Sequence, residues 1–240
     1  AVVALVGNWV GRHLGGLSAG PVAKADGSND TSKLFNWHPL LMTLAYALCM
    51  TEAVLAFRDH WRVSSFWQRL DPHIPTKTLH FALHTVAVVS ISLGLWAVFR
   101  SHNLKLGKDG VPTPMPNLYS SHSFLGLLTV SLSFMQYVCG ALVYGWPKAK
   151  GHLRAKALPL HKFLGFCVWT LGFATMIAGV QEKQTFLTAS HDNYDPPIVM
   201  AGLIQLALAF TWIATAAHLM LPALSQPKAA GAGESQPLVR

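Results

Sequence analysis

The residues of this chain that are best suited to chemistry are its histidines. The sequence has 12 of them in 240 residues. Four stand at the start of long apolar runs: His38, His80, His122 and His161. The last two share the pattern H-x-F-L-G. An ionisable side chain is costly inside an apolar segment unless it faces a partner, so these four histidines mark where a site is expected.

The apolar runs that carry the histidines predict membrane-spanning helices. Only 12% of the residues are charged and 52% are hydrophobic, whereas about a quarter of an ordinary soluble domain is charged. Five runs come close to the roughly 20 residues that a helix needs to cross a bilayer: residues 34–57, 79–99, 124–144, 163–180 and 198–221. A sixth, residues 1–10, is interpreted as the end of a helix whose first turns are missing. The expected fold is an all-α six-helix membrane bundle.

The segments between and after the runs predict the domain organisation and the orientation. Residues 1–222 are expected to form one membrane domain, and residues 223–240, rich in small and polar residues, a disordered tail. Eleven of the 18 Lys and Arg residues fall on one side of the membrane, in the loops that follow residues 34–57 and 124–144 and in the tail. The positive-inside rule places this side, with both termini, in the cytoplasm. The net charge of +8 therefore indicates no nucleic-acid partner.

The four histidines fall into two pairs at two depths, because consecutive spans run in opposite directions. His38 and His122 open the second and fourth spans, toward the non-cytoplasmic face, while His80 and His161 open the third and fifth, toward the cytoplasmic face. Each pair would suit a haem iron with a histidine on both sides, which favours electron transfer over oxygen binding. His84, four residues after His80 on the same helix face, is an alternative ligand. Otherwise each histidine is an interhelical hydrogen-bonding group.

Glycines accompany two of these histidines. Gly126 lies four residues after His122, and Gly165 lies four residues after His161, so each is one turn along on the same helix face. A bare turn leaves room for a flat porphyrin within a core of four helices. The alternative is that the small residues only let two membrane helices approach closely. The three cysteines form no C-x-x-C motif, so covalent haem attachment is not expected.

Together these features resemble the cytochrome b561 family of six-helix membrane proteins. The similarity covers nearly all of the chain from residue 9, and it lies in FNWHP, TEAVLAF, NLYSSHS, RAKALPLHKFLG and GVQEKQTFL. The resemblance implies two non-covalent haems b, each held by two histidines: His38 with His122 on the non-cytoplasmic side, and His80 with His161 on the cytoplasmic side. The spacing from His80 to Trp96 favours His80 over His84 as the ligand.

The resemblance also implies a reaction, in which ascorbate in the cytoplasm gives electrons across the membrane to monodehydroascorbate or a ferric chelate. It implies two substrate regions: Lys77, Tyr144 and Arg154 on the cytoplasmic side, and His102, Asn117 and Tyr119 on the other. Cations in a cleft would concentrate the ascorbate anion, although the positive-inside bias alone also places cations there. His102 is a candidate for proton uptake, or simply a polar helix end. Glu182 and Lys183 match a family motif, or are merely solvated.

Further implications and rival functions complete the prediction. The resemblance implies a homodimer in an endomembrane (vacuole, lysosome or secretory vesicle) or in the plasma membrane. One rival is a metal transporter with histidines along a pore, although Glu52 is the only acid within a full span. Another is a haem-bearing quinone reductase. The long loop after the second span, with Phe66, Trp67, Pro72 and Pro75, departs from the family pattern.

Overall fold

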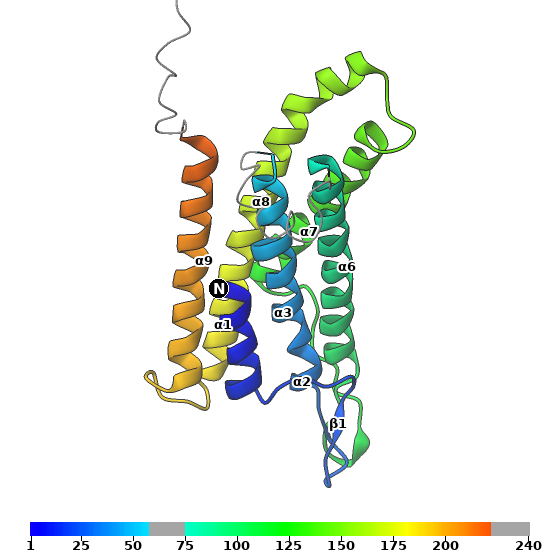
Figure 1. Cartoon of the computed structure of the whole chain (residues 1–240). Coiled ribbons are helices and arrows are strands. Elements are labelled where there is room, and N and C mark those ends of the chain that lie inside the picture. Colours follow the sequence, from blue (N-terminus) through cyan, green and yellow to red (C-terminus); the bar gives the residue numbers. More distant parts are fainter. Residues whose placement is uncertain (58–74, 222–240) are drawn as a thin grey trace, which may run out of the picture.

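The computed structural model describes residues 1–57 and 75–221. Within these ranges the chain is an elongated bundle of helices (Figure 1). Five helical segments are long and apolar enough to cross a membrane: Ser32–Leu55, Thr76–Asn103, Ser121–Tyr144, Gly151–Leu187 and Pro196–Met220. The prediction of an all-α membrane protein is therefore confirmed. The loop with Phe66, Trp67 and Pro72, and the tail at 223–240, lie outside the described residues.

The first helical segment is shorter than a span. It consists of α1 (Val2–Asn8) and a π-helical turn, η1 (Trp9–His13). Its 12 residues reach about 18 Å at 1.5 Å per residue. Trp9 fastens the segment to α9 (Pro196–Met220), because its buried indole Nε1–H donates a 2.9 Å hydrogen bond to the carbonyl of Pro197.

The second segment changes its helical geometry midway. It begins with α2 (Ser32–Phe35) and α3 (Trp37–Thr43), becomes π-helical in η2 (Leu44–Met50), and ends in α4 (Thr51–Leu55). The Thr51 hydroxyl donates to the Tyr46 carbonyl at 3.1 Å and accepts from the Trp169 indole at 3.0 Å. These bonds satisfy backbone and side-chain groups at the π-helical turns, which occur mostly where a helix serves a function.

Three long helices carry His80, His122 and His161: α6 (Thr76–Asn103), α7 (Ser121–Tyr144) and α8 (Gly151–Leu187). At 37 residues, α8 is about 55 Å long against a hydrocarbon core of about 30 Å. Its first turns project beyond the end of α6 (Figure 1). The expectation that His161 lies in the first turns of its helix is wrong, because α8 begins ten residues earlier. Pro159 is tolerated inside α8.

The opposite end of the bundle is covered by a small hairpin and a loop. The strands β1 (Val22–Ala23) and β2 (Asn29–Asp30) pair antiparallel, and the connection after α6 contains a short 3-10 turn, η3 (Lys108–Gly110). Asn29 joins the two: its side-chain Nδ2 donates to the Leu104 carbonyl at 2.7 Å, and its Oδ1 accepts from the Leu106 amide at 3.0 Å. This cap lies at the same end of the bundle as His38 and His122.

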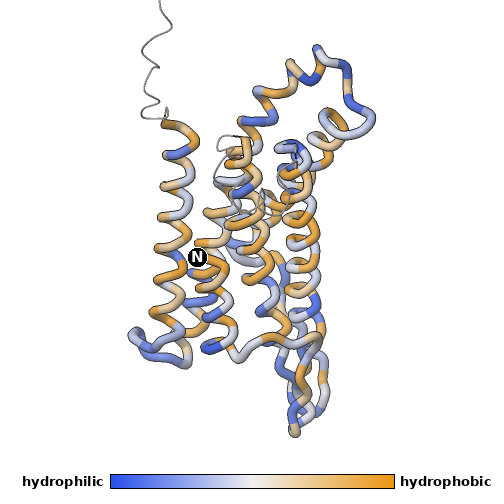
Figure 2. Tube along the Cα trace, viewed as in Figure 1, coloured by the Kyte–Doolittle hydropathy of each residue, from blue (hydrophilic) through white to orange (hydrophobic). Residues whose placement is uncertain are grey.

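The long helices are rich in hydrophobic residues (Figure 2). Large hydrophobic side chains on them are strongly exposed, such as Leu142 at 71%, Phe210 at 70% and Leu206 at 67%. A water-soluble protein rarely exposes so continuous an apolar surface. Lipid is the solvent that suits these faces, and the polar side chains that remain inside the bundle become the candidates for function.

Candidate functional site

The four histidines come together in two pairs, one toward each end of the bundle. The ring centres of His38 on α3 and His122 on α7 lie 6.1 Å apart, and those of His80 on α6 and His161 on α8 lie 6.4 Å apart. A metal–nitrogen bond of about 2 Å, with about 1 Å more to the ring centre, would place two axial rings about 6 Å apart across one iron. Both separations fit a haem held by two histidines.

Three of the four rings are oriented by backbone carbonyls. Nδ1 of His80 lies 2.8 Å from the Ala53 carbonyl, Nδ1 of His122 3.0 Å from that of Thr175, and Nδ1 of His38 3.2 Å from that of Gly94. A carbonyl can only accept, so each Nδ1 carries the proton and each Nε2 keeps a free lone pair. This is the tautomer that binds a metal through Nε2, with its orientation fixed by the second nitrogen.

The fourth ring is held by a side chain. Nε2 of Gln136, on α7, lies 3.0 Å from Nδ1 of His161 and donates to the His161 carbonyl at 2.7 Å. His84 lies beside the pair formed by His80 and His161, with its ring centre 4.5 Å from that of His80. The ring that pairs with His161, at 6.4 Å, is that of His80. The structure therefore favours His80 over His84 as the partner of His161.

The glycines that face the paired histidines most closely lie on neighbouring helices, and they are not Gly126 and Gly165. A Cβ on Gly179 of α8 would lie 2.6 Å from Cε1 of His122, and one on Gly140 of α7 would lie 3.2 Å from Cε1 of His161. Gly126 would instead meet a methyl group of Thr175 at 3.6 Å, and Gly165 would meet Gln136 at 3.3 Å. The close glycine for each ring comes from the neighbouring helix, which periodicity within one helix could not indicate.

A chain of hydroxyl groups lies between the two pairs. The Ser133 hydroxyl donates to the Thr129 carbonyl at 2.7 Å, so the buried Tyr46 hydroxyl donates the 2.9 Å bond that joins it to Ser133. Thr129 in turn donates to Leu125, so Thr175 is the donor in its 2.9 Å bond to Thr129. The chain links η2, α7 and α8 near the middle of the bundle. Sequence reasoning missed it, because single hydroxyls in a span are ordinary.

The hairpin end of the bundle joins several of the predicted substrate residues. Nδ1 of His102 lies 2.9 Å from Oδ1 of Asn117, whose Nδ2 donates to Asn103 at 3.0 Å. The ring of Phe35 stacks on His102 at 6.4 Å with an interplanar angle of 1°, and its centre is 5.8 Å from that of His38. Phe35 was not predicted as a site residue. Its ring lies between His102 and His38, so it connects His102 to the pair formed by His38 and His122.

Tyr119 and the Glu182–Lys183 motif lie on the same side. The Ser120 hydroxyl donates to Oε2 of Glu182 at 2.9 Å, and Nζ of Lys183 sits 5.3 Å from the ring centre of Phe35. Tyr119 is 55% exposed, and burial of its hydroxyl, followed by the charge of Glu182, raises the pKa of Tyr119. Neither charged residue of the motif is simply solvated, since each has a defined contact.

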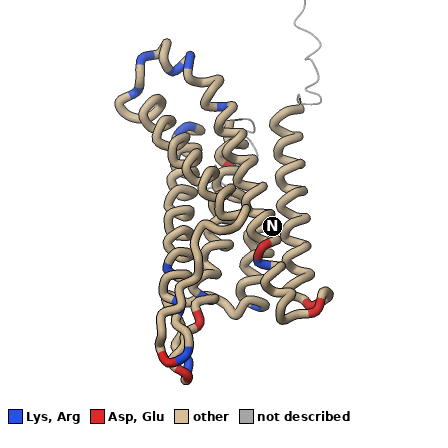
Figure 3. Tube along the Cα trace, turned by 180° about the vertical axis from the view of Figure 1, so that it is seen from behind, with Lys and Arg blue, Asp and Glu red and all other residues tan. Residues whose placement is uncertain are grey.

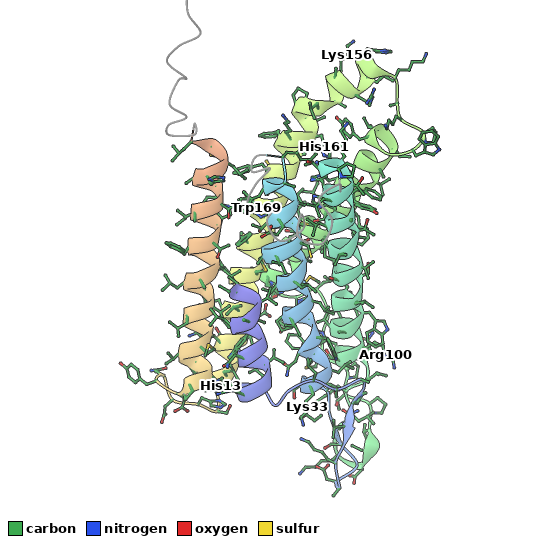
Figure 4. The ribbon with its side chains drawn as sticks, viewed as in Figure 1. His13, Lys33, Arg100, Lys156, His161 and Trp169 are labelled. Carbon is green, nitrogen blue, oxygen red and sulfur yellow. The ribbon has the colours of Figure 1, made fainter. Side chains whose placement is uncertain are left out.

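At the opposite end of the bundle, the predicted substrate residues Tyr144 and Arg154 lie close to His161. The ring of Tyr144 lies 5.2 Å from that of His161, and its hydroxyl donates to the Arg154 carbonyl at 3.2 Å. Nε of Arg154 is buried and has no hydrogen-bond partner within the described ranges. Lys77 is exposed on α6, three residues before His80. Figure 4 shows His161 and Lys156 at this end of the bundle and His13, Lys33 and Arg100 at the other.

Taken together, the fold and the comparisons below define the class of multi-pass membrane oxidoreductases. The chain belongs to the eukaryotic cytochrome b561 family, whose family model matches residues 37–187. This range contains all four paired histidines. The resemblance expected from the sequence is therefore confirmed.

Three relatives illustrate the family. The chain is 33% identical over 224 residues to the probable ascorbate-specific transmembrane electron transporter 2 of Oryza sativa subsp. japonica, covering 93% of this chain and 84% of the relative. It is 32% identical over 209 residues to the transmembrane ascorbate-dependent reductase of Ovis aries (87% and 73%). It is 38% identical over 157 residues to the lysosomal membrane ascorbate-dependent ferrireductase of Mus musculus (65% and 59%). All three names describe electron-transferring proteins.

Proposed function

We propose that this protein moves single electrons from cytoplasmic ascorbate, through two non-covalent haems b, to monodehydroascorbate or a ferric chelate on the other side. The observation that carries the proposal is the presence of two histidine pairs at opposite ends of one bundle. Their ring centres are separated by 6.1 Å in one pair and 6.4 Å in the other. A metal transporter would need ligands spread along a path. The names of the relatives support ascorbate as the donor.

In this proposal the histidines hold and orient the cofactors. His38 with His122 would ligate the outer haem, and His80 with His161 the inner one. Haem with two histidine ligands supplies a reversible one-electron couple without an open position for oxygen. The carbonyls that bind Nδ1 of His38, His80 and His122 keep these rings in the ligating tautomer.

At the inner end, Arg154, Lys77 and Tyr144 would bind ascorbate. Ascorbate is an anion at neutral pH, and cations at a cleft raise its local concentration. The buried Nε of Arg154 is an available donor, while the bond from Tyr144 to the Arg154 carbonyl holds that turn of α8 beside His161. Lys77 would add charge from α6, at the start of the helix that carries His80.

At the outer end, His102, Asn117 and Tyr119 would meet the acceptor. Asn117 contacts one nitrogen of His102, so the other nitrogen is left to exchange a proton with a bound acceptor. A proton is needed when monodehydroascorbate is reduced to ascorbate, and none is needed for a ferric chelate. Phe35, stacked between His102 and His38, gives this surface a packed connection to the buried pair.

The proposed sidedness rests on charge. Figure 3 shows Lys and Arg, without acids, along the start of α8, whereas acids and bases mix at the hairpin end. The basic end is the one with His161, so we propose that it faces the cytoplasm together with both termini. Residues 1–222 would form one domain, and the protein would be a homodimer of an endomembrane or of the plasma membrane. Protease accessibility of sealed vesicles tests the sidedness.

A visible spectrum of the purified protein, before and after addition of ascorbate, tests the function. We expect two haems b per chain, both reduced by ascorbate. His161→Ala should remove one haem and spare the other. A protein without haem, or with haem that a quinol reduces and ascorbate leaves oxidised, contradicts the proposal; the second outcome would favour a quinone reductase.

A further inference from the structure

Lys183 is a cation at an unexpected place on the outer surface. It lies near the end of α8, half-buried, with its ammonium 5.3 Å from the ring centre of Phe35. An ammonium over an aromatic ring is attracted by the negative face of the ring. The contact therefore holds the positive charge of Lys183 close to the bundle instead of letting it extend into solvent.

Phe35 connects this charge to the proposed acceptor site. The same ring stacks on His102 and approaches His38, and His102 is paired with Asn117. Lys183, His102 and Asn117 thus gather near one aromatic ring at the outer end of α3. Because Nζ of Lys183 and the ring of His102 lie 5.3 and 6.4 Å from the centre of the same ring, they are at most about 12 Å apart. This is close to the Debye length of about 8 to 10 Å, beyond which exposed charges are largely screened.

The neighbouring carboxylates leave much of this charge uncompensated. The carboxylate of Glu182 accepts a hydrogen bond from Ser120, the N-cap residue of α7. Asp30, at the end of β2, acts on Lys183 through space, and its Oδ1 accepts from the Ser32 amide at 2.8 Å. The positive field at Phe35 is therefore moderated by one carboxylate that is itself engaged with the backbone.

We propose that Lys183 binds the anionic group of the electron acceptor, so that the outer site selects acceptors that carry negative charge. This inference rests on the proposed function, in which electrons leave at this end. Monodehydroascorbate is a radical anion that takes one electron and one proton to become ascorbate. A ferric carboxylate chelate takes one electron as Fe(III) becomes Fe(II). Lys183 attracts both by charge, and it gives no advantage to an uncharged quinone or to a cation.

The test compares an anionic with a cationic one-electron acceptor. Proteoliposomes loaded with ascorbate are assayed with external ferric citrate and, separately, with hexaammineruthenium(III). For Lys183→Gln we expect the KM for ferric citrate to rise about tenfold with kcat within about twofold, because a lost charge contact weakens binding without changing the redox groups. The KM for the ruthenium complex should stay the same or fall. Salt at about 0.5 M should shrink the difference for citrate.

Three further variants sharpen the result. Lys183→Arg keeps the charge and should keep the low KM for citrate. Asp30→Asn removes the opposing carboxylate and should lower that KM. Lys108→Gln removes an exposed cation from the loop after α6 and is the matched control, expected to behave as the unmodified protein. Equal KM changes for both acceptors, or an unchanged citrate KM in Lys183→Gln, would overturn the inference.

The haem spectrum separates this inference from the proposed function. Each variant is first checked for two haems that ascorbate reduces. If ascorbate fails to reduce even the unmodified protein, the proposed function is wrong. If reduction is intact and the acceptors are not distinguished by Lys183, only the role of Lys183 is refuted.

Discussion

Replacing Gly179 by alanine should expel the outer haem. The added Cβ would lie 2.6 Å from Cε1 of His122 and 2.9 Å from Nδ1. Carbon atoms pack at about 3.5 to 4.0 Å, so the ring would have to move by about 1 Å. A metal–ligand bond of about 2 Å tolerates deviations of about 0.2 Å. The displacement exceeds this tolerance about fivefold, and His122 could no longer reach the iron.

Gly126→Ala is the matched control for this substitution. It adds the same methyl group to α7, but its Cβ would meet a methyl group of Thr175 at 3.6 Å, which is ordinary contact. We expect Gly179→Ala to retain one haem per chain, and Gly126→Ala to retain two. The measurement is haem stoichiometry together with a potentiometric titration, in which each haem gives its own midpoint.

The comparison also tests where a porphyrin lies. If Gly126→Ala loses a haem while Gly179→Ala keeps both with unchanged spectra, the groove beside Gly126 is the important one, and the reasoning from ring contacts is wrong. Retention of two unaltered haems in both variants would contradict the assignment of His122 as a ligand.

Three further outcomes are expected. Tyr46→Phe should lower the free energy of unfolding by about 0.6 kcal/mol, a typical value for a hydrogen bond inside a membrane protein, because Ser133 keeps its own acceptor; reversible unfolding in mixed micelles measures this. Arg154→Gln should raise the KM for ascorbate and weaken the salt dependence of haem reduction, measured by stopped-flow spectroscopy. Glu182→Gln should lower the pKa of Tyr119, seen by ultraviolet titration, since the carboxylate favours the neutral phenol; an unchanged pKa would leave burial as the sole cause.

The sequence predicted the spans and the meeting of the histidines because both follow from local rules. A run of about 20 apolar residues is enough to indicate a span, and the alternation of direction puts His38 near His122 and His80 near His161. Both inferences need only the order of residues along the chain. By contrast, His102 and Asn117 are 15 residues apart, and they were grouped at one site only by the family resemblance.

The features that the sequence did not reveal depend on how neighbouring helices face each other. Gly179 and Gly140 approach histidines on other helices, and nothing in the spacing within one helix tells which neighbour a glycine touches. The early start of α8 was missed because its first ten residues are polar enough to look like a loop. The stack of Phe35 on His102 depends on how the α2–α3 segment packs beside the end of α6.

The hydroxyl chain has a consequence for assembly. Tyr46, Ser133, Thr129 and Thr175 tie three helices together by bonds that involve no cofactor. In hydrocarbon, where water offers no competing partner, such bonds hold helices in register. We expect the helices to pack before haem binds. Haem would then enter a bundle that is already folded, and the helices would not need to fold around it. The cofactor-free protein should then keep its helix content, and added haem should restore it to function without refolding.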